Sequence, residues 1–337
     1  MTKRKLLILS PIPEDVVTLL VTSKVSATEL EGVSITTYKG TSKSDLIRAV
    51  ADADVIVGDY TSNVAMDEEV LRAAKRCIFI QQPSTGFERI DVDAATREGI
   101  SVANVAGSNT VAVAEHTLML ILACLKKMVL AHEKTKRGEW AQDEMPLYGV
   151  FELWGKTLGI IGMGRIGKEV AKRAKPFGPR LIYYDVNRLS PEDEKVLGLT
   201  YHSLDEVIAQ SDVITIHTPL APQTENLINA ERIAKMKPNV TIINVSRGAI
   251  VDEAALAKAL KEKRIQGAGL DVYAEEPINA KNPLLDAPNI ILTPHIAGAT
   301  NESRARIIDM TIDNVVSVLR GQEPINIVNG VKPRFSR

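Results

Sequence analysis

Cysteine is scarce in this sequence, whose 337 residues include only Cys77 and Cys124. Neither residue belongs to a Cys-x-x-Cys pair or to a spacing that would hold a metal ion, so the sequence predicts no metal site. A chain with so few cysteines does not depend on disulfide bonds, which favours a reducing compartment. We therefore expect a cytoplasmic protein in which both thiols are small core side chains.

An excess of charge of one sign is also missing. The 41 Lys and Arg residues nearly balance the 42 Asp and Glu residues, and the formal net charge is -1. Such a balance creates no overall field that would attract nucleic acid or an anionic membrane surface. We expect neither as a partner.

Long apolar runs are absent as well. The apolar run 6–9 follows a basic start but is too short for the core of a signal peptide. A helix expected from Val111 contains Glu115 and His116 and reaches Lys126. Its uncharged part falls short of the roughly 18–20 residues that span a bilayer, so we expect no membrane span.

Short apolar runs alternate with segments of helical spacing along the chain, which is typical of βαβ units and a parallel sheet. The pattern occurs before residue 104 and again from Thr157, so we predict two doubly wound α/β domains. The expected strands are 6–9, 55–57, 77–80, 158–161, 181–184, 213–216, 241–245 and 290–292. The expected helices are 14–20, 45–53 after the candidate cap Ser44, 67–75, 167–174, 204–210, 229–234, 252–262 and 301–319.

The domain boundaries are predicted near residues 104 and 298. The last helix, 301–319, carries apolar residues at helical spacing and is expected to return to the first domain. Residues 1–103 and 298–337 would then form one discontinuous domain, and residues 104–297 the other.

A glycine-rich turn, GMGRIG, follows the predicted strand 158–161 and opens a helix. Gly162 permits a tight turn, Gly164 lets the backbone approach a pyrophosphate, and Gly167 lets helix and strand pack closely. Such a turn alone also occurs without a nucleotide, but here Asp185 ends the next strand. Its carboxylate would accept hydrogen bonds from ribose hydroxyls and repel a 2′-phosphate, which favours NAD, although Arg188 nearby leaves NADP open.

Three polar residues follow later segments of the second domain. Arg247 comes after strand 241–245, where ligands bind in open α/β sheets, and its planar guanidinium suits the carboxylate of a 2-oxo acid. His295 follows strand 290–292 and offers an imidazole that donates or removes a proton near neutral pH. Glu276 would hold that imidazole and raise its pKa. Taken singly, an arginine such as Arg247 is more commonly part of a surface ion pair, a histidine such as His295 is more commonly structural, and a carboxylate such as Glu276 is more commonly solvated. The other four histidines are expected to be mostly structural: His116, His132, His202 and His217.

Short motifs occur in one order through nearly the whole chain. They are NVAG (104–107), VAEH (113–116), GIIGMGRIG (159–167), HTPL (217–220), NVSRG (244–248), VDE (251–253), GLDV (269–272), EEP (275–277) and TPHIAG (293–298). Together they resemble the D-isomer-specific 2-hydroxyacid dehydrogenase family. So many motifs in one order are not expected by chance.

The resemblance implies two Rossmann-like domains with the active site in the cleft between them. The discontinuous domain would bind the substrate and residues 104–297 would bind NAD. Arg247 would bind the carboxylate and polarise the carbonyl, His295 would act as acid and base, and Glu276 would be its partner. The implied cofactor contacts are Gly162, Gly164, Arg165, Ile166 and Gly167 at the pyrophosphate, Asp185 at the ribose, His217, Thr218 and Pro219 near the adenosine, Val245 and Asp271 at the nicotinamide carboxamide, and His295 and Gly298. The implied substrate contacts besides Arg247 are the backbone N–H groups of Ser84, Thr85 and Gly86.

The activity implied is hydride transfer between NAD(H) and a small D-2-hydroxy or 2-oxo acid, such as glyoxylate or hydroxypyruvate. The resemblance also implies a homodimer joined through the coenzyme domain, with the helix 111–131 as the candidate seam. Residues near Trp140 would reach the neighbouring active site.

Several alternatives follow from the same resemblance. Glu276 argues against a formate dehydrogenase, which carries glutamine there, and Thr85 argues against a phosphite dehydrogenase, which carries lysine. A short D-3-phosphoglycerate dehydrogenase remains open, without the C-terminal regulatory domains of the long form. An alternative of another class is an NADH-responsive corepressor of the same fold, against which we weigh the lack of a long extension and of a basic patch.

Overall fold

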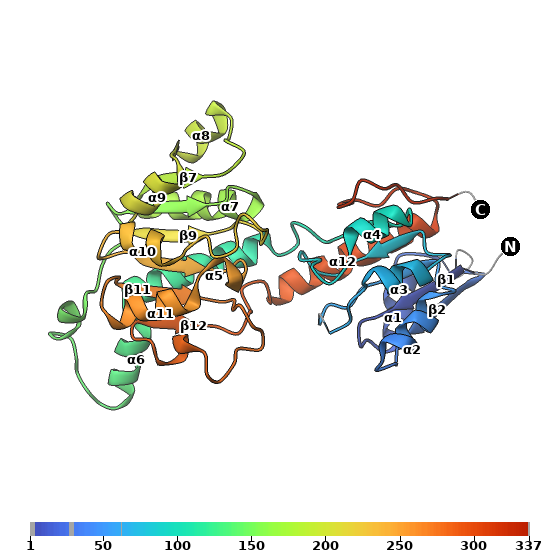
Figure 1. Cartoon of the computed structure of the whole chain (residues 1–337), viewed down its shortest axis with the longest axis horizontal. Helices are drawn as coiled ribbons and strands as arrows, with labels where there is room; N and C mark the ends of the chain where they lie inside the picture. Colours follow the sequence, from blue (N-terminus) through green and yellow to red (C-terminus); the bar gives the residue numbers. More distant parts are fainter. Residues whose placement is uncertain (1–3, 27–29, 62, 336–337) are drawn as a thin grey trace. The chain divides into compact units, whose positions relative to one another are not determined.

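The computed structural model describes residues 4–26, 30–61 and 63–335. The chain divides into two compact units, Met1–Asn109 with Asn301–Arg337, and Thr110–Thr300 (Figure 1). The boundaries lie a few residues C-terminal to the predicted ones. Each unit contains one parallel sheet with helices, which confirms the predicted class of two α/β domains. Within the described ranges, no helix has the length and apolar character needed to cross a membrane.

The first unit is built on a five-stranded sheet in the order β2-β1-β3-β4-β5. Helices α2, α3 and α4 cover one apolar core, and α1 and α12 cover the other. The strands are β1 (Arg4–Ile8), β2 (Val33–Thr37), β3 (Val55–Val57), β4 (Phe79–Gln81) and β5 (Ser101–Ala103). The helices are α1 (Glu14–Thr22), α2 (Lys43–Val50), α3 (Glu68–Ala73), α4 (Val92–Arg97) and α12 (Asn301–Leu319).

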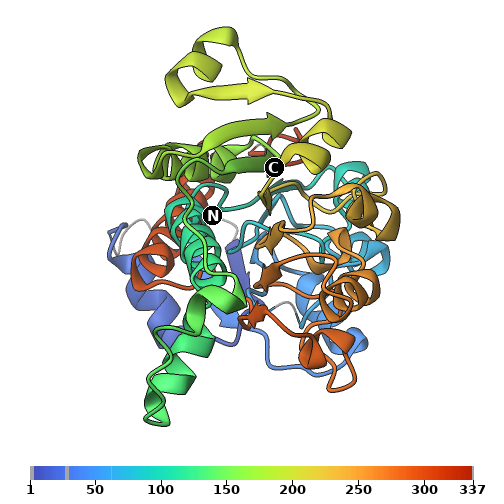
Figure 2. The ribbon, with the colours of Figure 1, turned by 90° about the vertical axis from the view of Figure 1, so that its left-hand side faces the viewer.

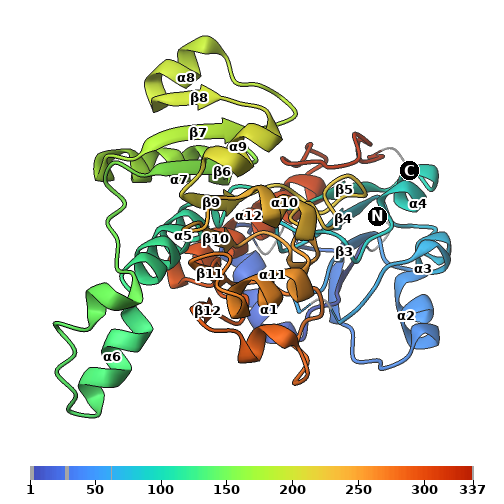
Figure 3. The same cartoon turned by 60° about the vertical axis from the view of Figure 1, so that its left-hand side comes forward.

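The second unit is built on a seven-stranded sheet in the order β12-β11-β10-β9-β6-β7-β8 (Figure 3). The strands are β6 (Thr157–Ile161), β7 (Arg180–Tyr184), β8 (Leu199–Tyr201), β9 (Val213–Ile216), β10 (Thr241–Asn244), β11 (Gly267–Leu270) and β12 (Ile290–Leu292). The helices are α5 (Thr110–Leu125), α6 (Met128–Lys136), α7 (Arg165–Ala174), α8 (Pro191–Leu197), α9 (Leu204–Gln210), α10 (Ala230–Lys235) and α11 (Glu253–Lys261). The short 3-10 helices are η1 (Met145–Tyr148), η2 (Lys175–Phe177), η3 (Gly248–Ile250) and η4 (Pro283–Asp286).

The seven-stranded sheet changes direction at β6. This strand pairs with β7 on one side and with β9 on the other, and both pairings are parallel. Successive crossovers therefore leave opposite faces of the sheet at this point, between the carboxyl ends of β6 and β9. Open α/β sheets bind their ligands at such a switch point.

Two local predictions were wrong. The cap of α2 is Ser42 rather than Ser44: the Ser42 hydroxyl accepts a hydrogen bond from Asp45 N at 3.2 Å, and Ser42 N donates one to Asp45 Oδ2 at 3.2 Å. The helix expected over 111–131 is broken at Lys127, whose left-handed backbone (φ 51°) separates α5 from α6. The Lys127 ammonium donates to Gln266 O at 3.2 Å, so a side-chain anchor accompanies the break.

Candidate active site

The glycine-rich turn lies at the carboxyl end of β6 and opens α7. Gly162 has a φ of +94°, and a Cβ there would lie 2.6 Å from the carbonyl carbon of His217. A Cβ at Gly167 would lie 2.2 Å from Gly162 O. At Gly164, by contrast, no atom of the described residues outside the adjoining backbone would come within 4 Å. Both outer glycines are required by close packing, while the middle one leaves open space beside the N-terminus of α7. The turn therefore fits a dinucleotide pyrophosphate.

Asp185 follows β7 and is fixed against the same turn. Its Oδ2 accepts a hydrogen bond from Met163 N at 2.6 Å, and its Oδ1 accepts one from Asn187 N at 2.8 Å. Each carboxylate oxygen retains a further lone pair for a ligand hydroxyl. The structure thus brings the acidic residue and the glycine turn together, as dinucleotide binding requires.

His217, Thr218 and Pro219 follow β9, the other strand of the switch point. His217 N donates to Ile161 O at 2.7 Å, which places this segment beside the glycine turn. Desolvation by burial lowers the pKa of His217 to about 3, so its ring is neutral, and it lies 2.9 Å from the Thr215 hydroxyl. This histidine holds the loop and is not placed to exchange protons near neutral pH.

His295 and Glu276 form the shortest acid–histidine pair in the described part of the chain. The His295 Nδ1 lies 2.6 Å from Glu276 Oε2, while Glu276 Oε1 accepts from Tyr273 N at 3.0 Å. The hydrogen bond that His295 donates to Glu276 raises the pKa of His295 and outweighs desolvation. About half of the imidazole, 51%, is exposed, so a bound molecule can reach it. The ring is accessible, and its partner favours the protonated form.

The backbone at His295 is unusual. Its φ is +53°, in the left-handed region that non-glycine residues rarely adopt. The backbone N–H of His295 donates to Asp271 O at 2.8 Å, which holds this conformation. Backbone strain of this kind concentrates at functional sites. It directs the imidazole toward Glu276.

Arg247 follows β10 and belongs to the same group of side chains. Asn244 Nδ2 donates to Arg247 O at 2.9 Å, and Arg247 Nη1 donates to Ser246 O at 2.8 Å. A Cβ at Gly248 would lie only 1.8 Å from the carbonyl carbon of Tyr273, so the arginine segment packs directly on the segment before Glu276. Burial raises the pKa of Glu276, but the hydrogen bonds from His295 and Tyr273 and the nearby positive charges outweigh it, so the pKa is lowered. Arg247 carries one of these charges.

A buried network that the sequence analysis missed supports the His295 loop. Asp271 has no exposed surface, and its Oδ1 accepts hydrogen bonds from the Thr293 hydroxyl at 2.6 Å and Ile296 N at 2.9 Å. Its Oδ2 accepts one from Ala297 N at 2.8 Å. Because the Thr293 hydroxyl donates to Asp271, its lone pair accepts from His116 Nε2, 3.1 Å away. Asp271 therefore clamps the loop, and its contact with the nicotinamide stays a prediction.

The remaining predicted cofactor residues lie close to these groups along the chain. Val245 is buried directly after β10, and Gly298 follows the clamped residue Ala297. The sequence could not show that Asp271 binds the Thr293 segment. Both residues belong to motifs, GLDV and TPHIAG, whose polar side chains could equally contact a ligand.

Ser84, Thr85 and Gly86 lie in the first unit, after β4. Every carbonyl of this loop accepts a hydrogen bond: Ser84 O from Val105 N at 3.3 Å, Thr85 O from Asn104 Nδ2 at 2.7 Å, and Gly86 O from the Ser84 hydroxyl at 2.6 Å. The Ser84 hydroxyl in turn accepts from Gln82 Nε2 at 2.8 Å. Sequence reasoning missed Gln82 and Asn104 because neither amide stood out from its motif.

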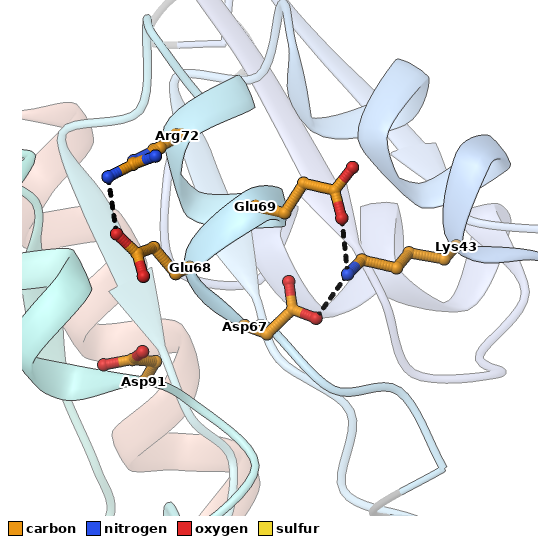
Figure 4. Close-up of a pocket in the computed structure, with 6 residues that line it drawn as sticks. All are labelled: Lys43, Asp67, Glu68, Glu69, Arg72 and Asp91. Atoms are coloured by element: carbon orange, nitrogen blue, oxygen red, sulfur yellow. Dashed lines mark ion pairs between the residues drawn. The ribbon is translucent and has the colours of Figure 1, made fainter.

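A charged surface pocket in the first unit lies between α2, α3 and the start of α4 (Figure 4). Lys43 pairs with Asp67 at 2.7 Å and with Glu69 at 2.6 Å, and Arg72 pairs with Glu68. Asp67 also caps α3, as Asp91 caps α4. These charges already serve the fold, so the pocket adds nothing to the site. Among the described residues, no group of three or more His, Cys, Asp or Glu is arranged to hold a metal ion.

Comparison with known proteins agrees with this geometry. Residues 118–297 match the family model described as D-isomer specific 2-hydroxyacid dehydrogenase, NAD binding domain. The chain is 41% identical over 290 residues to a glyoxylate reductase of Korarchaeum cryptofilum, with 86% of each protein covered. It is 37% identical over 325 residues to a D-3-phosphoglycerate dehydrogenase of Archaeoglobus fulgidus, covering 96% of this chain and 59% of that protein. A solved glyoxylate reductase from Paecilomyes thermophila has a TM-score of 0.86 and 31% identity, with 97% and 99% of the two chains covered.

Proposed function

The chain belongs to the D-isomer-specific 2-hydroxyacid dehydrogenases, and from this premise we propose that it reduces a small 2-oxo acid, glyoxylate or hydroxypyruvate, with NADH. The family makes it an NAD-dependent oxidoreductase. The observation that carries the proposal is the 2.6 Å pair of His295 and Glu276 on the same unit as the dinucleotide turn. The similarity to glyoxylate reductases supports the size of the acid.

The proton transfer is assigned to His295. Its Nδ1 is engaged by Glu276, so Nε2 is the nitrogen that donates a proton to the carbonyl oxygen of the oxo acid. The carbonyl carbon would receive the hydride that a bound NADH would supply, and the electron pair of the C=O bond would move to the oxygen that His295 protonates. Glu276 stabilises the imidazolium before the transfer. In the reverse reaction the neutral imidazole removes the hydroxyl proton.

Arg247 is assigned to the substrate carboxylate. A guanidinium keeps its charge and offers two parallel N–H donors to a carboxylate. The Arg247 charge is one of the influences that lower the pKa of Glu276, and it opposes the overall rise in the pKa of His295. Arg247 is therefore close to both groups, which supports placing its guanidinium beside the reacting carbonyl.

The loop 84–86 is proposed to bind the substrate carboxylate through its backbone N–H groups. All of its carbonyls are used within the first unit, as described above. In the part of the chain that the structure describes, the N–H groups of Ser84, Thr85 and Gly86 donate to no protein acceptor. They are therefore available to an anion.

The coenzyme is assigned to the switch point of the second unit. Gly162, Gly164 and Gly167, with Arg165 and Ile166, would hold the pyrophosphate, and Asp185 would accept from the ribose hydroxyls. His217, Thr218 and Pro219 would line the adenosine. Val245, Asp271, His295 and Gly298 would lie along the nicotinamide.

A homodimer is proposed from the apolar surface of the second unit. Helix α6 has no buried residue and stands clear of the sheet (Figures 2 and 3). Met119 on α5, Met128 on α6, and Trp140 and Leu147 beyond them are all exposed. A second copy of the chain would cover them. Light scattering should give twice the chain mass, and Leu147→Asp should shift the species toward the monomer.

The experiment that tests the activity follows the loss of NADH absorbance with a panel of 2-oxo acids: glyoxylate, hydroxypyruvate, pyruvate, phenylpyruvate and 3-phosphohydroxypyruvate. Turnover is expected with glyoxylate or hydroxypyruvate. A preference for 3-phosphohydroxypyruvate would instead support the second candidate, a short D-3-phosphoglycerate dehydrogenase, which the similarity across 96% of this chain favours. Absence of turnover with all five acids, while NADH still binds, would contradict both.

A further inference from the structure

The loop after Asp185 carries a cation whose charge is already used. Arg188 Nε lies 2.9 Å from Glu194 Oε1, and Arg188 Nη2 lies 3.1 Å from Glu194 Oε2. This is a two-point guanidinium–carboxylate pair, the strongest geometry for such groups. The guanidinium also lies over the Tyr201 ring, 5.1 Å from its centroid. Two partners therefore hold Arg188 on the α8 side of the loop.

The Glu194 carboxylate is placed by the fold and not only by Arg188. The hydroxyl of Tyr183, a fully buried residue of β7, donates to Glu194 Oε1 at 2.7 Å and accepts from Leu189 N at 2.9 Å. Only 13% of the Glu194 side chain is exposed, against 60% for Arg188. Glu194 is therefore held in place by the fold, and Arg188 is the more exposed partner that pairs with it.

Helix α8 is itself anchored on the coenzyme-binding helix. Ser190 caps α8 by accepting from Asp193 N at 3.1 Å, and Asp193 pairs with Lys168 of α7 at 3.2 Å. Glu194 follows directly in the same turn. These contacts fix the position of α8 and so keep the Glu194 carboxylate opposite Arg188.

A free arginine at this place would change coenzyme choice. NADP differs from NAD by a phosphate on the ribose 2′ oxygen, and an arginine near the ribose accommodates that phosphate. A guanidinium already paired with a carboxylate cannot offer the same N–H donors, and its charge is neutralised nearby. We propose that Glu194, by holding the Arg188 guanidinium, excludes the 2′-phosphate and makes the coenzyme site selective for NAD. This inference rests on the proposed placement of the adenosine ribose at Asp185.

The specificity then has two layers. Asp185 repels the 2′-phosphate directly, and Glu194 withdraws Arg188, a nearby cation that would compensate that repulsion. The pairing lowers the pKa of Glu194 and raises that of Arg188, so both groups remain charged throughout the neutral range. Because the second pKa of a 2′-phosphate lies near about 6, the selectivity should not depend on pH between about 7.5 and 9, where that phosphate is fully ionised.

The test compares Glu194→Gln with Glu192→Gln. Both variants remove one negative charge from the first turn of α8, but Glu192 is exposed and is not part of the Arg188 pair. Dissociation constants for NADH, NADPH and adenosine 2′,5′-bisphosphate are measured by calorimetry on the full chain. We expect Glu194→Gln to tighten NADPH and the bisphosphate about tenfold while NADH changes less than about twofold. Glu192→Gln should leave all three constants nearly unchanged.

A double-mutant cycle assigns the gain to the arginine. Arg188→Ala alone should have little effect on NADPH affinity because the guanidinium is already withheld, whereas Arg188→Ala added to Glu194→Gln should abolish the gain. Persistence of the gain without Arg188, an equal gain in Glu192→Gln, or no gain at all would each overturn the proposal.

Asp185→Ala separates this inference from the site on which it rests. Weaker NADH binding in Asp185→Ala, together with no gain in Glu194→Gln, would leave the ribose placement intact and overturn only the role of Glu194. Unchanged NADH binding in Asp185→Ala would overturn both.

Discussion

The pairs His295–Glu276 and His116–Asp271 of the second unit behave in opposite ways. His295 and Glu276 are 2.6 Å apart, the imidazole is half exposed, and its pKa is raised. His116 Nε2 lies 3.6 Å from Asp271 Oδ1, and burial lowers the pKa of His116 despite the nearby charge. A neighbouring acid is therefore not sufficient to make a histidine a proton donor.

The difference lies in how each carboxylate is already used. Asp271 accepts hydrogen bonds from Thr293, Ile296 and Ala297, so little of its charge is directed at His116. Glu276 accepts one backbone hydrogen bond and directs its second oxygen to the imidazole. The Asp271–His116 pair supports a loop around a histidine whose pKa is lowered, whereas the Glu276–His295 pair raises the pKa of an exposed histidine.

The largest effect is expected from removing the exposed imidazole. His295→Ala should lower kcat/KM for the oxo acid by about 10²–10⁴-fold, the usual contribution of a general acid. The dissociation constant for NADH should stay nearly unchanged, as measured by fluorescence titration. His202→Ala is the control, since His202 lies beyond β8 and carries no assigned role. Full activity of His295→Ala would refute the assignment.

Removing the buried acid should instead affect stability. Asp271→Ala leaves the donors of Thr293, Ile296 and Ala297 without their acceptor, at a cost of about 1–3 kcal/mol for the buried donor of Ala297 and less for the other two, which are only partly buried. We expect the free energy of unfolding of this unit to fall by about 3 kcal/mol, measured as a lower melting temperature. Asp286→Ala, at an exposed acid, should change it by less than about 0.5 kcal/mol. Equal melting temperatures would show that the clamp contributes little.

The pH dependence should be set chiefly by Glu276, whose hydrogen bond is the largest influence on the pKa of His295. Reduction needs protonated His295, so its rate falls as the pH rises through the raised pKa of this group, and oxidation falls as the pH drops through it. Glu276→Gln removes the hydrogen bond and charge that raise this pKa, so both limbs should move to lower pH. Reduction above neutral pH should lose about tenfold, whereas oxidation should be less affected. Unmoved pH profiles of kcat/KM would contradict the pairing.

The smallest effect is expected at the buried histidine. His116→Gln keeps a donor toward the Thr293 hydroxyl and changes no charge, because burial keeps this histidine neutral. Turnover should remain within about threefold, and stability should fall by about 1 kcal/mol, the net value of one hydrogen bond. A displaced pH profile, as large as that of Glu276→Gln, would show that the two pairs are coupled.

The buried strands and the exposed acid–histidine pair could be predicted from sequence because each leaves a local mark. Runs such as 6–9 and 290–292 are wholly apolar, and His295 and Arg247 each stand three residues after a strand. Strand β11, with the sequence GAGL, was not predicted, since two glycines in four residues favour a loop. The structure explains them: a Cβ at Gly269 would lie 3.2 Å from both Cys124 Sγ and Leu120 Cβ of α5. Only the tertiary packing reveals this need.

Other features depended on contacts that no local pattern contains. Lysine is a good helix former, so nothing in the sequence marked Lys127 as the break between α5 and α6; its anchor is Gln266, far along the chain. The clamp at Asp271 was missed for the same reason. Its partners lie more than twenty residues away, and a buried carboxylate is indistinguishable in sequence from one that faces a ligand.

The position of α12 has a consequence for synthesis. One core of the first unit joins β-strand residues such as Leu6 and Phe79 to Ile312, Val315 and Val316 of α12. The whole of the second unit is translated between these segments. At a translation rate of roughly 5–20 residues per second, the apolar residues of the first unit stay exposed for on the order of ten to forty seconds before α12 is made and can pack on them. During that interval the nascent chain presents this face to chaperones and to other unfinished copies, so the first unit to emerge from the ribosome is the last to be completed.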